Sequence, residues 1–300
     1  MQPKKILFLA VMVLAIGTAK SQEKDSTDLV SMLEKETFGD STVYTRATFK
    51  TTRLINGHTV ENVGKGVLDV KISHRFGTLN KGGYELFGLD NATMRMGLDY
   101  GITNNLMVGI GRSTFQKTYD AFLKVKLLRQ STGKVNMPVT LSYVSTIALK
   151  TLRRSDPALK NPLSSRLFYS HQLIVGRKFS AGTSLQLMPT YIHRNLAELT
   201  KDPNDILAIG IGGRQKLTKR VSINVEYYYQ LPGHKQDTST NSLSIGFDIE
   251  TGGHVFQLHF TNSMGMSERT FIGETTGKWG KGDILFGFNI SRVFNIGKKR

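Results

Sequence analysis

The chain has 300 residues, a formal net charge of +17 and 39% hydrophobic residues. It contains no cysteine, which excludes disulfide frameworks, cysteine-ligated metal sites, thiol nucleophiles and a lipid anchor on an amino-terminal cysteine. The composition argues against a bundle of membrane helices but is compatible with a membrane β-barrel, in which only every second strand residue must be apolar.

The amino terminus has the pattern of a secretion signal. A pair of lysines precedes an apolar run of 11 residues, 6–16, which is shorter than the roughly 20 residues needed to span a bilayer. Small residues are present at Ala19 and Ser21, as expected before a cleavage site. We therefore predict a signal peptide over residues 1–21 and export of the rest of the chain.

The next stretch, residues 22–65, lacks the regular alternation of apolar and polar residues that marks the rest of the chain. Residues 22–40 are polar and acidic, and residues 42–55 have some strand character. Such a segment either extends into the periplasm, where a periplasmic partner can bind it, or folds back as a plug into a barrel formed by the rest of the chain. We predict that at least residues 49–60 pack in the mouth of that barrel.

From residue 66 onward, apolar and polar residues alternate strictly, as in strands with one apolar face. Leu68 and Val70 fall on one face of the first such run, and Asp69 and Lys71 fall on the other. Most runs have the length of a tilted membrane strand, about 9–11 residues, rather than the 5–6 that are common in soluble sheets. The predicted strands are 67–76, 92–102, 106–114, 119–130, 135–150, 166–179, 183–194, 205–217, 220–231, 241–250, 253–264 and 282–296.

Short and long connections alternate between these strands, apart from a short third connection at 115–118. The alternation is typical of outer-membrane barrels, which have short periplasmic turns and long outer loops. The short turns are predicted at 104–105, 131–134, 180–182, 218–219 and 251–252. The long outer loops are predicted at 77–91, 151–165, 195–204, 232–240 and 265–281.

The predicted fold class is therefore all-β. We expect an antiparallel up-and-down transmembrane β-barrel of about 12 strands over residues 66–297, located in the bacterial outer membrane, with a short N-terminal periplasmic or plug segment over 22–65. A closed barrel is favoured because membrane-facing strands must satisfy all their backbone hydrogen bonds within the sheet. A secreted lipocalin-like or sandwich protein is the alternative.

Several stretches resemble an uncharacterised Bacteroidetes family, the domain of unknown function DUF5777. The resemblance implies an outer-membrane β-barrel over about residues 44–296 and no assigned activity. The stretches that carry it are Phe49–His58, Gly64–Val67, Ile72–Gly77, Tyr84–Asp90, Met107–Ser113 and Leu127–Gln130.

The polar strand faces carry charges of both signs, which suits a lumen of paired charges with a mild preference for anions. A 12-strand barrel is intermediate between small barrels that side chains fill and wide porins. A narrow or gated channel, or a binding barrel, for a small solute is therefore the favoured function, and a non-conducting structural or partner-docking barrel is the alternative. The predicted lumen-lining residues are Lys71, Arg75, Arg95, Asp99, Lys124, Lys126, Arg166, Arg194, Arg214, Glu226, Asp248 and His259.

Motifs for chemistry are weak. The glycine-rich stretches 109–111 and 210–213 lie inside predicted strands, without the helix that a nucleotide-binding loop requires. The stretch 273–279 departs from a phosphate-binding loop in its spacing and in having Trp279 after the lysine. The histidines show no metal-binding spacing. We expect no catalytic residues, no cofactor and no metal.

A membrane lipid hydrolase is a lesser alternative, because it needs a lipid-facing histidine and serine close together. His259 shares a face with Ser263, but that face is predicted to line the lumen. His171 falls in lipid-facing register near mid-strand, which requires either a register slip or a protein contact there.

The expected partners are outer-membrane lipid, lipopolysaccharide and the barrel assembly machinery, and no nucleic acid is expected. Because neither Phe294 nor Ile296 is the last residue of the chain, the assembly machinery would have to recognise one of them at an internal position.

Overall fold

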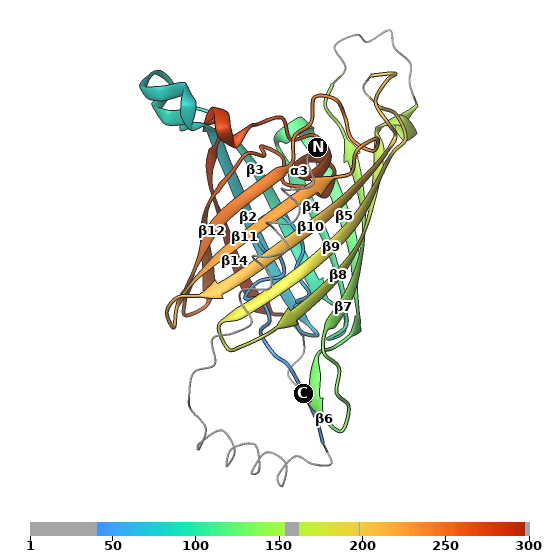
Figure 1. The fold of residues 1–300 in the computed structure, drawn as a ribbon, viewed down its shortest axis with the longest axis vertical. Helices are drawn as coiled ribbons and strands as arrows, with labels where there is room; N and C mark the ends of the chain where they lie inside the picture. Colours follow the sequence, from blue (N-terminus) through green and yellow to red (C-terminus); the bar gives the residue numbers. More distant parts are fainter. Residues whose placement is uncertain (1–40, 154–161, 198, 298–300) are drawn as a thin grey trace, which may run out of the picture. The chain divides into compact units, whose positions relative to one another are not determined.

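The computed structural model describes residues 41–153, 162–197 and 199–297. The described residues form a closed barrel of twelve antiparallel strands and a separate two-stranded sheet (Figure 1). Barrel strands that follow each other in the chain are also neighbours in space, and β14 (Leu285–Asn295) pairs with β2 (Val67–Thr78) to close the barrel. The predicted fold class is confirmed. The predicted signal peptide lies outside the described residues.

Each predicted strand overlaps an observed one. The largest difference is in the fifth, which begins at Thr140 rather than at residue 135 because Pro138 has no N–H to donate to the ladder. The predicted short turn 131–134 is wrong for the same reason: residues 129–139 connect the two strands, and β6 (Ser131–Gly133) within them pairs with β1 (Thr42–Tyr44). The other barrel strands are β3 (Ala92–Gly101), β4 (Leu106–Ser113), β5 (Thr118–Leu128), β7 (Thr140–Lys150), β8 (Leu167–Lys178), β9 (Thr183–Arg194), β10 (Asp205–Lys216), β11 (Val221–Gln230), β12 (Ser242–Thr251) and β13 (His254–Thr261).

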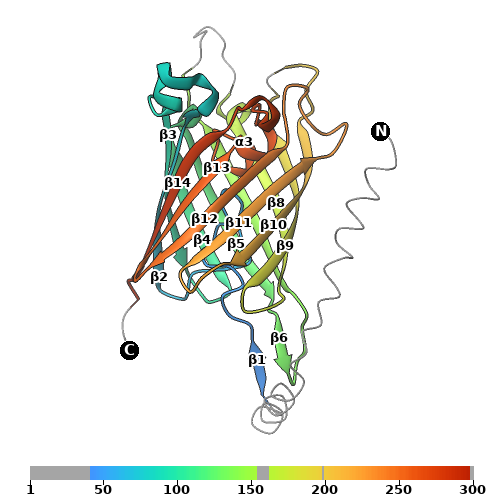
Figure 2. The same cartoon turned by 60° about the vertical axis from the view of Figure 1, so that its left-hand side comes forward.

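The two ends of the barrel differ in their connections (Figure 2). At one end, the turn end, four of the hairpins have connections of four residues or fewer. At the other, the loop end, the connections are longer, apart from residues 114–117, and several of them contain short helices. These are η2 (Leu79–Gly88), η3 (Phe115–Lys117), η4 (Leu163–Arg166), α3 (Glu268–Gly273) and η5 (Trp279–Lys281). Among the residues that the structure describes, none of the helices is long and apolar enough to cross a membrane.

The outer face of the barrel is mainly apolar, and several polar residues on it contact aromatic rings. His171 keeps its outward register opposite Tyr191, and its Nδ1 lies 2.7 Å from the Tyr143 hydroxyl. Its ring stacks on both tyrosine rings, with centroids 6.1 and 6.3 Å away. The expected register slip is therefore absent, because neighbouring tyrosines accommodate this histidine. Arg177 and Arg292 face outward near the turn end, each over the aromatic ring two residues further on.

The hydrophobic core lies inside the barrel. Apolar inward residues gather on β8 to β10 and at Tyr228 of β11, where polar side chains alternate with them, whereas the inward residues of β2, β3, β12 and β13 are largely polar or charged. The face formed by β2, β3, β12 and β13 is called the charged wall. The apolar residues on the opposite strands, here called the apolar wall, are Phe168, Ile174, Met188, Ile192, Ile206, Ala208 and Tyr228. The buried core residues are Phe49, Leu54, Val60, Val63, Met107, Phe122, Val144, Ile174, Met188, Ile192, Ile206, Ala208, Tyr228, Phe271 and Ile272.

Candidate functional site: the plugged lumen

Residues 48–63, which we call the plug hairpin, lie inside the barrel. They come directly before β2, and they enter and leave the lumen by the turn end. Arg53 bridges to His58, and the Leu54 N–H donates to the Gly57 carbonyl at 2.8 Å. The reversal of the chain therefore falls at residues 55–56, ahead of the Asn-Gly pair that favours tight turns.

Position 57 requires glycine because the surrounding side chains leave no room for a Cβ atom. A Cβ atom at this position would lie 2.0 Å from the Tyr228 hydroxyl oxygen, and Tyr228 is fully buried in the apolar wall. The tip of the plug hairpin therefore fits against β11 only when residue 57 has no side chain.

The variant Gly57→Ala is expected to destabilise the barrel by about 1–3 kcal/mol, the usual cost of overpacking a filled core. The urea midpoint of unfolding in detergent measures this loss. Adding Tyr228→Phe removes the clashing oxygen and is expected to restore part of the stability. An equal loss in the single and double variants would contradict this account of the tip.

The apolar side of the plug hairpin packs on two glycines of the barrel wall. Leu54 covers Gly212 on β10, where a Cβ atom would lie 2.6 Å from the Leu54 Cδ2. Val60 covers Gly176 on β8 in the same way. Both apolar side chains are at most 2% exposed. The glycines thus form the recesses that receive the hairpin.

The tip is held on its polar side by one carboxylate. Glu226 on β11 accepts backbone N–H groups from Ile55 at 3.2 Å, Asn56 at 2.8 Å and Gly57 at 3.1 Å. Arg75 on β2 donates to the Asn56 side-chain oxygen at 2.8 Å. Three successive amides that converge on one buried carboxylate fix the position of the tip.

The charged wall pairs its ions within the barrel. Lys71 on β2 contacts Asp99 on β3 and lies 3.2 Å from Asp69. Arg95 on β3 forms two contacts with Asp120 on β5, one of them at 2.9 Å. These buried charges are therefore partnered, as low-dielectric surroundings require.

A second segment reaches into the lumen from the loop end. All residues of α3 are buried, and the helix begins where the Ser267 N–H donates to the Thr270 hydroxyl at 3.2 Å. Glu268 of α3 accepts a hydrogen bond from Arg53 Nη1 of the plug hairpin at 2.7 Å. Phe271 packs edge-on against Tyr228, with ring centroids 5.2 Å apart. The segment predicted as an outer loop, 265–281, thus meets the plug hairpin inside the barrel.

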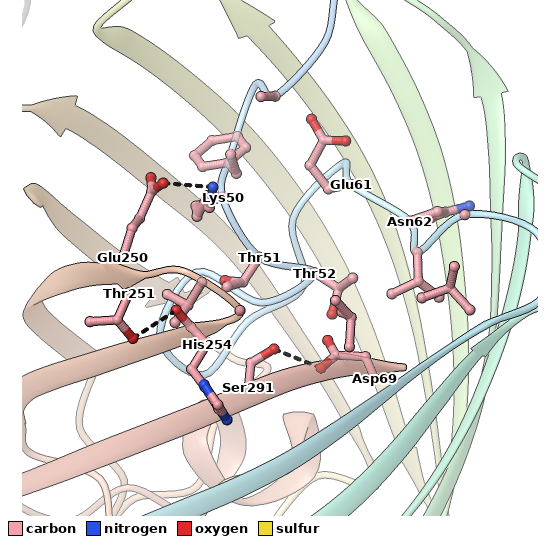
Figure 3. A pocket seen from close by; sticks show the side chains of 18 of the residues that line it. Lys50, Thr51, Thr52, Glu61, Asn62, Asp69, Glu250, Thr251, His254 and Ser291 are labelled. Atoms are coloured by element: carbon pink, nitrogen blue, oxygen red, sulfur yellow. Dashed lines mark hydrogen bonds and ion pairs between the residues drawn. The ribbon is translucent and has the colours of Figure 1, made fainter. Parts of the chain in front are cut away.

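A vestibule remains open between the plug hairpin and the turn end of β2, β12, β13 and β14 (Figure 3). Its volume is about 690 Å³, within the range of small-molecule sites. Lys50 of the plug hairpin pairs with Glu250 at 2.6 Å across it, and Ser291 donates to Asp69 at 2.6 Å. Glu61 also points toward this space (Figure 3). The vestibule is therefore a mixed polar and apolar chamber.

The model of a membrane-bound β-barrel domain, DUF5777, matches residues 49–294. The chain belongs to this family. The match begins in the plug hairpin, so most of the plug lies within the DUF5777 domain. No curated protein matches the chain.

Solved barrels also resemble this DUF5777 protein. The NanC porin has 8% sequence identity and a TM-score of 0.45, with 75% of this chain and 98% of that chain covered. The KdgM porin has 8% identity and a TM-score of 0.45, with coverage of 76% and 99%. An outer membrane channel from Pseudomonas putida F1 has 14% identity and a TM-score of 0.47, with coverage of 78% and 98%.

The DUF5777 barrel places most of the predicted lumen residues on its inner face. Lys126 is half-buried near the turn end, 3.7 Å from Glu61. Arg166 is a wrong prediction: it lies in η4, before β8 begins, and donates to the Leu152 carbonyl at 2.8 Å at the loop end. The residues that point inward and are buried are Lys71, Arg75, Arg95, Asp99, Lys124, Arg194, Arg214, Glu226, Asp248 and His259.

Arg53 and Glu268 are functional candidates that sequence reasoning missed. They lie 215 positions apart, in segments without strand alternation, so no local pattern links them. A weak signal for the tip was available in the Asn-Gly pair at 56–57, which is typical of hairpin turns.

Proposed function

We propose that the protein is an outer-membrane channel of narrow bore, closed in this state by the plug hairpin and α3, that opens for a small solute. The turn end would face the periplasm, and residues 1–21 would be the export signal. One observation carries the proposal. Both arms of the plug hairpin leave the lumen by the turn end, so the hairpin can be withdrawn without threading the chain through the barrel.

The nature of the contacts supports a channel that rests closed. Burial of Leu54 and Val60 favours the inserted hairpin by about 3–6 kcal/mol, at 1.5–3 kcal/mol for each side chain. The hydrogen bonds at the tip, in contrast, are of the kind that water can replace. After withdrawal, the charged wall would line a hydrated path that continues from the vestibule.

A removable lock tests whether the plug hairpin is the gate. The ideal Cβ of Gly176 lies 3.5 Å from the Cβ of Val60, which suits a disulfide, and the chain has no other cysteine. We expect residues 22–300 of the wild type to show brief openings in a planar bilayer. The oxidised Val60→Cys, Gly176→Cys double variant should be silent, and a reductant should restore the openings.

The single-cysteine variants are the matched controls and should behave alike with and without oxidant. Openings that persist in the fully oxidised double variant would show that the gate is elsewhere. A folded wild-type barrel that never conducts would favour the second candidate, a non-conducting structural or partner-docking barrel. The tight apolar fit of Leu54 and Val60 is the observation that supports this second candidate.

A further inference from the structure

A narrow crevice continues from the vestibule along the charged wall. It shares Thr51, Val255 and Ser291 with the vestibule and runs between the plug hairpin and the strands β2, β13 and β14. Its volume is about 30 Å³, enough for one group of the size of a water molecule. The crevice adjoins the vestibule on its turn-end side.

The charged residues that line the crevice are all cations: Arg53, Lys71 and Arg95. The carboxylates that pair with them lie outside its lining. The amides of Gln257 and Asn289 and the hydroxyl of Ser291 already donate hydrogen bonds within the barrel, so the cations are the groups that would hold an anion.

Arg53 has donors to spare at this point. Its Nη1 donates to Glu268 at 2.7 Å and to the Asn56 carbonyl at 2.8 Å. Its Nε and Nη2 are buried and have no hydrogen-bond partner among the described residues, and its side chain is 10% exposed. Unsatisfied buried donors on a charged group are costly, and an anion in the crevice would satisfy them.

We infer that the crevice binds a small monovalent anion of the size of chloride. The plug hairpin supplies Arg53, whereas β2 and β3 supply Lys71 and Arg95, so the site is complete only while the hairpin is inserted. A ligand that binds only one state stabilises that state. Chloride would therefore hold the channel closed; this coupling rests on the proposed function, whereas the binding itself does not.

The linewidth of ³⁵Cl in NMR of the refolded protein in detergent tests the binding. Wild type should broaden the chloride signal, and Arg53→Gln should reduce the excess linewidth at least fivefold. Glu268→Gln removes a competing carboxylate and should strengthen binding at least twofold. A purely structural role would weaken binding in both variants, and that result, or unchanged broadening in Arg53→Gln, would overturn the inference. Arg112→Gln, on the outer face, is the matched control and should match wild type.

Two further arms separate the binding from the proposed function. The oxidised double-cysteine variant holds the hairpin inserted and should broaden the chloride signal as wild type does. Replacing chloride by gluconate at constant ionic strength should raise the open probability of wild type at least threefold. Binding in the locked protein together with a wild type that never conducts would reject the channel and keep the anion site. An open probability that is the same in chloride and in gluconate would overturn the coupling between anion binding and channel closure.

Discussion

Replacing Arg95 with methionine is expected to destabilise the folded barrel by about 3–5 kcal/mol, the cost of leaving one member of a buried ion pair alone. Arg95 and Asp120 have side chains only 3% and 1% exposed. Without the guanidinium, the carboxylate would stay in the lumen with no cation opposite it. The measurement is unfolding in urea, followed by the fluorescence of the single tryptophan, Trp279.

The control replaces both partners with apolar residues of similar size. The double variant Arg95→Met, Asp120→Leu is expected to recover most of the lost stability, because a buried ion pair is often no more stable than a hydrophobic pair. Equal midpoints for wild type and Arg95→Met would show that water screens this pair in the lumen.

Glu226→Gln is expected to release the tip of the plug hairpin. A glutamine side chain turns one acceptor oxygen into donors, so at least one of the three tip N–H groups loses its partner. The cost is about 1–3 kcal/mol, which corresponds to an increase of about 5- to 150-fold in the population of the withdrawn hairpin. The rate of tryptic cleavage after Arg53 measures that population, because this bond is buried while the hairpin is inserted.

Glu250→Gln is the matched control, since Glu250 pairs with Lys50 in the first arm of the plug hairpin, away from the tip. It should leave the rate of cleavage after Arg53 within about twofold of wild type, the range of an exposed ion pair. Cleavage that rises equally in both variants would assign the effect to general loss of charge rather than to the tip.

The strands could be predicted from the sequence because membrane and lumen impose opposite demands on alternate residues. Apolar and polar residues alternate without interruption in the strand around Lys71, and the inward orientation of Lys71 follows directly from that alternation. The prediction for Arg166 is wrong because the alternation of apolar and polar residues does not mark where a strand begins, and β8 begins one residue later. The turn 131–134 was wrong because Pro138 ends the ladder early, although the alternation around it continues.

The interior of the barrel could be predicted less well. The packing of residues 49–60 in the barrel mouth was expected, but their partners were not, because each contact joins positions far apart in the chain. Glu226 meets three amides about 170 positions away. α3 has six residues, too few to show a helical period. The sequence therefore predicts only an outer loop over 265–281, which contains this buried helix.

The apolar wall of the lumen has a consequence for how the barrel is assembled. The pairing of β14 with β2 joins segments more than 200 residues apart, so it carries the largest loop-closure entropy of the strand pairings. An open sheet would expose the apolar wall, and the plug hairpin, with Leu54 and Val60, is a tethered segment that covers part of it. We expect that docking of Leu54 and Val60 there would hold β2, which follows the hairpin in the chain, near the sheet until β14 is added. The segment that fills the finished lumen would then also be the template around which the barrel closes.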